Sequence, residues 1–302
     1  MSKRALFIAT LSWEPRFLEG ARRILRDGEF SDILCFWFKE FEGRTAEAKR
    51  NFAKEFADLN PRFEMLQFSP PDASPRDIPA IEINLWKRIF EILAPITKEV
   101  STFTFDITTT PREALWTVLD LLAEAGLLGS VVYHRALSHG HWCGGEPEPP
   151  HIVPKLGGIS ALDKPTKLLI LTGFDDDRSK QFILHFEPTE TLILLQEGID
   201  PEAEKSRRLH TSQFARRKAI RLETFDSYSQ DWGFARMKEL AVPFSQESNL
   251  MLASVGPKTS AVALYQLHRL LPNSALVYSP CRDYNVNYSH GIGDTLRLRW
   301  DS

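Results

Sequence analysis

Residues 249–264, Asn-Leu-Met-Leu-Ala-Ser-Val-Gly-Pro-Lys-Thr-Ser-Ala-Val-Ala-Leu, decide the fold class of this chain. Their first six residues are mostly apolar and predict a buried β-strand, whereas residues 258–271 have the periodicity of a helix. A second apolar run at 275–278 predicts another strand. A strand, a helix and a strand in this order form a βαβ unit with parallel strands. The stretch therefore predicts an α/β fold.

The same alternation runs through the rest of the chain and predicts two related Rossmann-like halves with mostly parallel sheets. It is interrupted at 140–167, which holds five prolines and five glycines. We therefore expect a first half at 1–140, a linker at 141–166 that packs in part on one half, and a second half at 167–302. The expected strands are 5–11, 33–38, 63–68, 102–108 and 131–133, then 167–172, 191–195, 220–225, 249–254 and 275–278.

Composition narrows the class of protein. The 302 residues are 43% hydrophobic and 25% charged, with a formal net charge of −3, which fits a globular protein and disfavours a globally basic nucleic-acid binder. The apolar runs are too short to cross a bilayer, and the N-terminal run lacks a signal-peptide cleavage site. Three cysteines make no closed disulfide framework. These features predict a cytoplasmic protein with no membrane contact.

The two halves repeat one series of features in one order, which predicts an internal duplication. In each half, the loop after the first strand carries a Thr and an Arg six positions apart, and the loop after the fourth strand carries a Pro followed by a basic residue. A chance likeness between two α/β domains is the alternative. The five matched pairs are 10–16 with 172–178, 42–50 with 197–205, 107–112 with 253–258, 131–133 with 276–278, and 138–140 with 289–291.

The loops after the first and fourth strands suit a phosphate group. Ligands bind outside the carboxyl ends of parallel strands, where helix N-termini offer free N–H groups. Capping of the helices by Thr, Ser and Pro is the structural alternative, and neither a Walker A loop nor a Gly-x-Gly-x-x-Gly fingerprint is present. The candidate ligand-binding residues are Thr10, Arg16, Thr109, Thr110 and Arg112 in the first half and Thr172, Asp176, Arg178, Gly256, Lys258 and Thr259 in the second.

The order strand, Gly256-Pro-Lys-Thr259, helix, strand resembles the signature of CARF domains, which are Rossmann-like sensors of cyclic oligonucleotides in prokaryotic antiviral defence. Two such units in one chain resemble the SAVED arrangement. The first half departs from the signature, with Thr-Thr-Thr-Pro-Arg at 108–112. The resemblance implies a nucleotide-like ligand at the seam between the halves. It also implies a protein partner, an effector encoded separately, because CARF and SAVED proteins usually carry an effector domain that is not evident here.

Four residues are candidate catalytic groups. Asp176 suits a magnesium ion in front of a phosphate, or else the positive end of a helix dipole. His139 and His290 recur in a Ser-His-Gly motif, and Cys281 precedes Arg282, which favours a thiolate. Local pairing is the alternative for two of the ligand candidates, since Arg16 and Arg178 each follow a carboxylate, such as Glu14 and Asp176.

Two further stretches carry clustered polar residues. His134, His139, His141, Cys143 and His151 fall within 18 residues, but their spacing matches no zinc signature and their Gly- and Pro-rich surroundings cost ordering entropy. We expect no bound metal and no cofactor. The second stretch, from Lys205 to Arg221, suits contact with a nucleic-acid backbone or, alternatively, a solvated helix face. Its seven basic residues are Lys205, Arg207, Arg208, Arg216, Arg217, Lys218 and Arg221.

The leading hypothesis is a protein that binds a nucleotide or cyclic oligonucleotide in prokaryotic antiviral defence. One alternative is a hydrolase or transferase that acts on a nucleotide-like phosphate compound at the same sheet edge. Another is a non-catalytic subunit of a nucleic-acid-associated complex. The sequence leaves open whether the chain is an enzyme.

Overall fold

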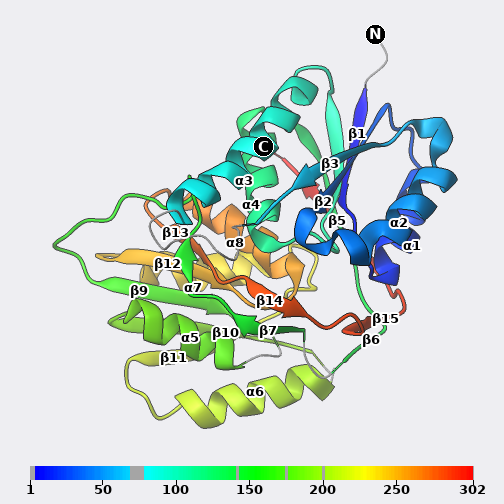
Figure 1. Cartoon of the computed structure of the whole chain (residues 1–302). Helices are drawn as coiled ribbons and strands as arrows, with labels where there is room; N and C mark the ends of the chain where they lie inside the picture. The colour runs from blue at the N-terminus through cyan, green and yellow to red at the C-terminus, as the bar shows by residue number, and fades with distance from the viewer. Residues whose placement is uncertain (1–3, 69–77, 141–142, 174–175, 199–200, 302) are drawn as a thin grey trace. The chain divides into compact units, whose positions relative to one another are not determined.

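The computed structural model describes residues 4–68, 78–140, 143–173, 176–198 and 201–301. The chain divides into two compact units, the first formed by Met1–Cys143 with Asn285–Ser302 and the second by Gly144–Tyr284. Each unit contains a six-stranded, mostly parallel sheet (Figure 1). The prediction of an α/β fold with two Rossmann-like halves is confirmed.

The first sheet has the strand order β16-β5-β4-β1-β2-β3, in which only β16 is antiparallel to its neighbour. Its central strand is wholly apolar from Leu6 to Ala9 and at most 1% exposed there, as a strand covered on both faces requires. Helices α1 and α2 lie on one face and α3 and α4 on the other (Figure 1). The elements are β1 (Ala5–Thr10), α1 (Pro15–Leu25), β2 (Asp32–Phe38), η1 (Lys39–Phe41), α2 (Glu42–Glu55), η2 (Ala57–Leu59), β3 (Arg62–Leu66), α3 (Ile78–Thr97), β4 (Thr102–Asp106), α4 (Arg112–Glu124), β5 (Leu128–His134) and β16 (Thr295–Trp300).

The second sheet has the order β11-β10-β9-β12-β13-β8, with only β8 antiparallel. Its central strand β9 is again fully buried from Leu168 to Leu171. Helices α5 and α6 lie together on one side of the sheet and α7 and α8 on the other (Figure 1). The elements are β8 (His151–Ile152), β9 (Thr166–Leu171), α5 (Asp176–Phe186), β10 (Glu190–Gln196), α6 (Pro201–Phe214), β11 (Ile220–Phe225), α7 (Phe234–Phe244), β12 (Asn249–Ser254), α8 (Lys258–Leu270) and β13 (Ala275–Tyr278).

The parallel strands of both units follow one spatial order. Numbered along the chain within each unit, they run 3-2-1-4-5, which is the doubly wound Rossmann order. The order reverses between strands 1 and 4, that is, between β1 and β4 and between β9 and β12. Ligands of such folds bind at this switch point, outside the carboxyl ends of the strands. The loops chosen from the sequence leave the sheets at these two points.

Four of the five sequence matches join equivalent places in the two units, namely the β1–α1, β2–α2 and β4–α4 connections and strand β5 of the first unit with their counterparts in the second. The fifth match is wrong. Its two Ser-His pairs form β6 (Ser138–His139) and β15 (Ser289–His290), which pair with each other in the first unit. They are the two strands of one antiparallel ribbon and not copies of one loop.

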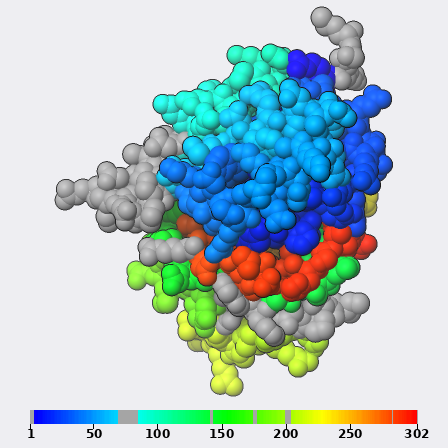
Figure 2. All heavy atoms as spheres, turned by 45° about the vertical axis from the view of Figure 1, so that its right-hand side comes forward, coloured from blue at the N-terminus to red at the C-terminus, as the bar shows by residue number. Residues whose placement is uncertain are grey.

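The unit boundaries differ from those expected. The last residues return to the first unit because β16 hydrogen-bonds along β5 from Thr295 to Trp300; part of this segment is visible at the surface in Figure 2 (red). Part of the expected linker packs on the second unit, where β8 pairs with β13 and β7 (Gly144–Pro147) pairs with β14 (Cys281–Tyr284). In the described part of the chain, no helix is long and apolar enough to span a membrane.

Candidate functional site

In the first unit, threonine hydroxyl groups hold together the two loops at the switch point. The Thr10 and Thr110 hydroxyls lie 2.9 Å apart, and the Thr109 hydroxyl donates to the Thr10 carbonyl oxygen at 2.6 Å. Thr10 and Thr110 are buried, whereas Thr109 is half-buried. The three threonines therefore tie the loop after β1 to the loop after β4, and Thr109 is the one that solvent reaches.

Two glycines fix the same place in the second unit. A Cβ at Gly256 would lie 2.4 Å from the Thr172 carbonyl oxygen, and one at Gly173 would lie 2.5 Å from the Val255 carbonyl oxygen. The loops after β9 and β12 thus pack backbone against backbone, which only glycine permits. The sequence suggested that Gly256 admits a ligand to the backbone; the group that approaches it here is the neighbouring loop.

A basic residue occupies the first position of the following helix in both units. Arg112 begins α4 and Lys258 begins α8, each directly after a proline at the N-cap position, and this proline provides no side-chain hydrogen bond to the helix. Both cationic side chains are half-buried. A helix start with a cation at its first residue is a suitable place for a phosphate, because the N–H groups and the dipole attract an anion.

The next residue of α8 carries an unusual hydroxyl group. Thr259 is fully buried, and its Oγ1 forms no hydrogen bond with any described residue. Its neighbour Ser260 is also buried, but its hydroxyl donates to the Pro257 carbonyl at 2.7 Å and lies 3.0 Å from Ser254 Oγ. Thr172 is buried too and donates to the Leu194 carbonyl at 3.0 Å. The hydroxyls of Ser260 and Thr172 therefore both form hydrogen bonds within the second unit, and these bonds stabilise the loops after β9 and β12.

Arg16 pairs with a local carboxylate, one of the two alternatives that the sequence left open. It is 4% exposed, and its guanidinium lies 2.5 Å from Glu14 Oε2 and donates to the His134 carbonyl at 3.0 Å. Burial by itself lowers the pKa of Arg16, but the carboxylate of Glu14 and the phenol of Tyr133 raise that pKa above its ordinary value. The charge of Arg16 is thus held inside the first unit, where it joins α1 to the end of β5.

A buried acid and a buried histidine lie side by side in the first unit, and the sequence did not predict that they form a pair. Asp106 ends β4 and His134 ends β5; both are at most 2% exposed, and His134 Nε2 lies 3.6 Å from Asp106 Oδ2. Burial raises the pKa of Asp106 and lowers the pKa of His134, while the attraction between the two opposes both shifts. Gly20 packs on the ring, since a Cβ there would lie 2.4 Å from His134 Cδ2. The sequence feature that could have indicated this pair is the polar residue at the end of each of the two apolar strands.

Arg178 of the second unit holds the end of β13. Its guanidinium donates to Cys281 Sγ at 2.7 Å and to the Ser279 carbonyl oxygen. Cys281 and Arg178 are both half-exposed, and burial raises the pKa of the nearby Tyr284 phenol. Arg178 is therefore at the edge where it was expected, but it contacts the thiol of one catalytic candidate.

A buried histidine supports the loop after β9, which the sequence also missed. His210 of α6 is fully buried, with Nδ1 2.9 Å from the Ser206 carbonyl and Nε2 3.1 Å from Ser179 Oγ. The Ser206 hydroxyl donates to the Gly173 carbonyl oxygen. The two helices α5 and α6 are thus tied to the glycine that packs against the β12–α8 loop.

The remaining candidates are dispersed. His139 is half-buried and its ring lies 5.1 Å from that of Tyr288, whereas His290 is exposed. The side chain of Asp176 lies outside the described residues, as does His141. Where the structure describes the chain, no three His, Cys, Asp or Glu side chains come together in a way that would hold a metal ion. That the protein binds no metal stays a prediction.

No protein-family model matches the chain, and no curated protein matches it. Among solved structures, a type III CRISPR defence DNA nuclease activated by cyclic oligoadenylate is similar, with a TM-score of 0.50 and 10% sequence identity over 90% of this chain. The match spans 65% of the length of that nuclease. At this identity the similarity shows a shared fold.

Two further structures are more distant. A putative universal stress protein from Pseudomonas aeruginosa has a TM-score of 0.25 at 11% identity, covering 91% of this chain and 92% of that one. A 3-dehydroquinate dehydratase from Geobacillus kaustophilus has a TM-score of 0.17 at 13% identity, covering 89% and 92%. Neither adds to the argument.

Proposed function

We propose that the switch-point edges bind a nucleotide or cyclic oligonucleotide and that the protein is a sensor of such a ligand in prokaryotic antiviral defence. One observation carries the proposal: Arg112 and Lys258 occupy the same position of the fold, the first residue of the helix beside the reversal of strand order. Such an edge is where doubly wound sheets bind ligands. An anionic phosphate satisfies both the helix N–H groups and the cation.

The similarity in fold supports the kind of ligand. The similar CRISPR nuclease is activated by cyclic oligoadenylate, and a cyclic oligonucleotide carries several phosphates. The chain repeats its phosphate-suited helix start in both units, so each unit by itself offers a place for a phosphate. Thr109 is half-buried beside Arg112 and is a suitable donor to such a ligand.

The protein purified from its native host should carry the ligand or bind it on addition. Denaturing the pure protein and analysing the supernatant by mass spectrometry should reveal a nucleotide or cyclic oligonucleotide. If none is carried, isothermal titration with cyclic oligoadenylates of different ring size and with mononucleotides should show binding of at least one. Absence of binding throughout the panel would contradict the proposal.

Incubation of the bound compound with the protein separates a sensor from the enzyme alternative. A sensor returns the compound unchanged in chromatography, whereas a hydrolase or transferase converts it. In the second case Asp176, His139, His290 and Cys281 are the first residues to substitute.

A further inference from the structure

Helix α6 of the second unit has an inner face and a basic outer face. Ser206, His210 and Phe214 recur every four residues and are each at most 5% exposed, so this side of the helix packs inward. The residues between them are mostly polar, and Arg208, Leu209, Thr211 and Ser212 are exposed. Seven of the residues from Lys205 to Arg221 are basic. They lie on α6, on the loop that follows it and at the start of β11, which are at the surface in Figure 2 (yellow-green, lower edge).

Most of these cations have no carboxylate partner among the described residues. Arg208 pairs with Glu204 at 2.5 Å and Arg221 with Glu223 at 2.7 Å. No ion pair joins any of the other five to an acid of the described chain. Arg207 reaches only the main-chain carbonyls of Gln196 and Gly198, each at 3.3 Å. The cations without a carboxylate partner are Lys205, Arg207, Arg216, Arg217 and Lys218.

A solvated helix face of mixed charge would show a different pattern, because its cations would pair with acids three or four residues away. Arg208 forms such a pair with Glu204, four residues before it, but Arg216, Arg217 and Lys218 have no acid within four residues on either side. The alternative structural role is support of the α6 dipole by cations near its C-terminus. That role needs one or two charges in the last turn, whereas these five extend from the first half of α6 past its end.

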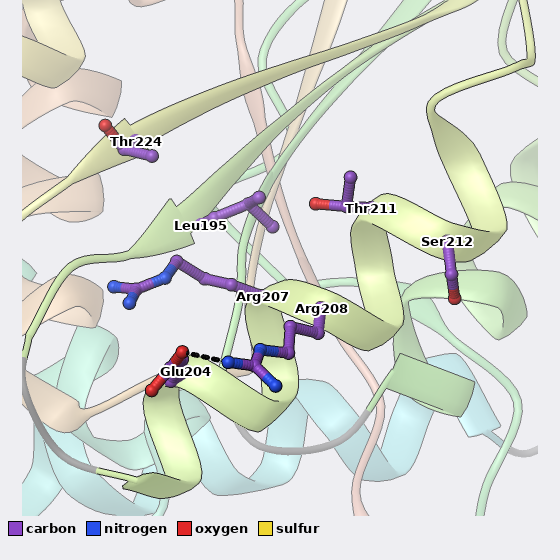
Figure 3. Close-up of a pocket in the computed structure, with 7 residues that line it drawn as sticks. All are labelled: Leu195, Glu204, Arg207, Arg208, Thr211, Ser212 and Thr224. Atoms are coloured by element: carbon purple, nitrogen blue, oxygen red, sulfur yellow. Dashed lines mark hydrogen bonds and ion pairs between the residues drawn. The ribbon is translucent and has the colours of Figure 1, made fainter.

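A shallow hollow of about 550 Å³ opens between α6 and the ends of β10 and β11. Figure 3 shows Arg207 and Arg208 extending beside one end of it, with Thr211 and Ser212 further along the helix. The hydroxyls of Thr211 and Ser212 thus lie between the arginines of the hollow and the basic residues after α6. We call this surface the α6 groove; it is lined by Leu195, Glu204, Arg207, Arg208, Thr211, Ser212 and Thr224.

We infer that the α6 groove and the basic residues after it bind the sugar–phosphate backbone of a nucleic-acid duplex without reading its sequence. Lys, Arg, Ser and Thr are the side chains that contact phosphates in protein–DNA interfaces. Phe214 of α6 and Phe225 at the end of β11 are each 1% exposed, so neither ring is offered to stack on an unpaired base. The contact therefore suits paired strands, whose bases are stacked on one another and whose phosphates line the outside.

The inference goes beyond the proposed sensor and does not depend on it. The chain as a whole carries a net charge of −3, so long-range attraction of nucleic acid is weak and the affinity comes from local contacts. Counterion release then makes binding steeply dependent on salt. With five unpaired cations engaged, log K falls with log salt with a slope of about −4 to −5.

The test is fluorescence anisotropy of the full chain with labelled DNA duplexes of two unrelated sequences, at salt concentrations from about 50 to 250 mM. We expect equal affinity for both sequences. The double substitution Arg216→Gln and Lys218→Gln should weaken binding roughly ten- to a hundredfold near 0.1 M salt and reduce the slope by about two. If this variant fails to fold, the pair Lys205→Gln and Arg207→Gln replaces it, with the same expectation.

The matched control changes two exposed cations elsewhere on the second unit, Lys238→Gln and Arg269→Gln, and should leave duplex affinity within about twofold. The Arg216→Gln and Lys218→Gln variant should also keep its melting temperature and its affinity for any small nucleotide that the wild type binds, so a failure of the sensor proposal is detected separately. The inference is overturned by absence of duplex binding at about 50 mM salt, by equal losses of affinity in the Arg216→Gln and Lys218→Gln variant and in the control variant, or by an Arg216→Gln and Lys218→Gln variant that melts at a lower temperature but binds normally.

Discussion

Gly256 lies directly against the carbonyl group of Thr172, so closely that a Cβ at position 256 would be 2.4 Å from the carbonyl oxygen. In the first unit, the equivalent contact joins the hydroxyls of Thr110 and Thr10 at 2.9 Å. The two units therefore use different chemistry, a glycine contact and a hydroxyl contact, to hold together the loops that follow strands 1 and 4. In both cases the contact fixes the start of the helix that we propose binds a phosphate.

Gly256→Ala should destabilise the second unit. The added methyl group has to push away a backbone carbonyl, which cannot rotate aside as a long side chain can, so we expect a loss of about 1–3 kcal/mol in the free energy of unfolding. Differential scanning calorimetry should show this as a lower melting temperature.

Gly43→Ala is the matched control. Gly43 lies in α2 with no atom within 4 Å of the position of an added Cβ, and alanine is favoured over glycine in a helix by about 0.5–1 kcal/mol. This variant should be as stable as the wild type or more stable. If Gly256→Ala behaves like Gly43→Ala, the loop contact does not constrain the switch point.

Adjacent hydroxyls of α8 should respond in opposite ways. Thr259→Val replaces a buried hydroxyl that has no partner among the described residues, so thermal stability should stay the same or rise. Ser260→Ala removes a hydroxyl bonded to the Pro257 carbonyl and should cost about 0.5–1.5 kcal/mol. Melting curves of the two variants measure both effects. Equal destabilisation by both would mean that the Thr259 hydroxyl has a partner in the folded protein.

Stability should fall as the pH is lowered through about 6.5. Burial depresses the pKa of His134 in the first unit and of His268 in the second below the ordinary value of 6.5. The unfolded chain therefore binds protons on these histidines near pH 6.5, whereas the folded chain does not, and protonation favours unfolding. Chemical unfolding between about pH 5.5 and 7.5 should show a decrease towards the acid side.

Single substitutions assign this pH dependence to a unit. His134→Asn should reduce the acid-side loss in the first unit and His268→Asn should reduce it in the second. The raised pKa of Asp106 acts with the opposite sign, because the folded state then holds a proton that the unfolded carboxylate releases. The quantity to compare is therefore the difference in the free energy of unfolding between the wild type and each variant at each pH. A pH profile unchanged by both substitutions would show that neither histidine is kept neutral by folding.

Much of the fold could be predicted from the sequence because its strands are short, apolar and flanked by polar loops. The parallel strands, the alternation with helices and the position of the two switch-point loops followed from this pattern. The return of β16 to the first sheet did not, because Thr295–Trp300 alternates apolar and polar residues like any edge strand and the residues of β5 with which it pairs are 161 to 171 positions earlier in the chain. Pairing between strands so far apart in the sequence produces no local sequence pattern that would predict it.

The candidate site was predictable at the level of loops but not of side chains. Arg112 and Lys258 are where the sequence placed them, at the first helical positions. Arg16 and Arg178 have the same sequence context, yet one is paired with Glu14 and the other contacts Cys281. Glu14 is a local partner and was one of the two alternatives for Arg16, whereas Cys281 is 103 residues from Arg178 and is brought to it only by the folding of the second unit.

Calorimetric titration of wild type and Lys258→Ala with cyclic oligoadenylates and mononucleotides tests the central claim most directly. A charge-assisted hydrogen bond is worth about 1.5–3 kcal/mol, so the substitution should weaken binding of the ligand roughly ten- to a hundredfold. The melting temperature should change little, because a cation at a helix start does not favour the dipole. Equal affinities of the two proteins for every ligand that binds, with a lowered melting temperature in the variant, would contradict the claim that this edge is the site.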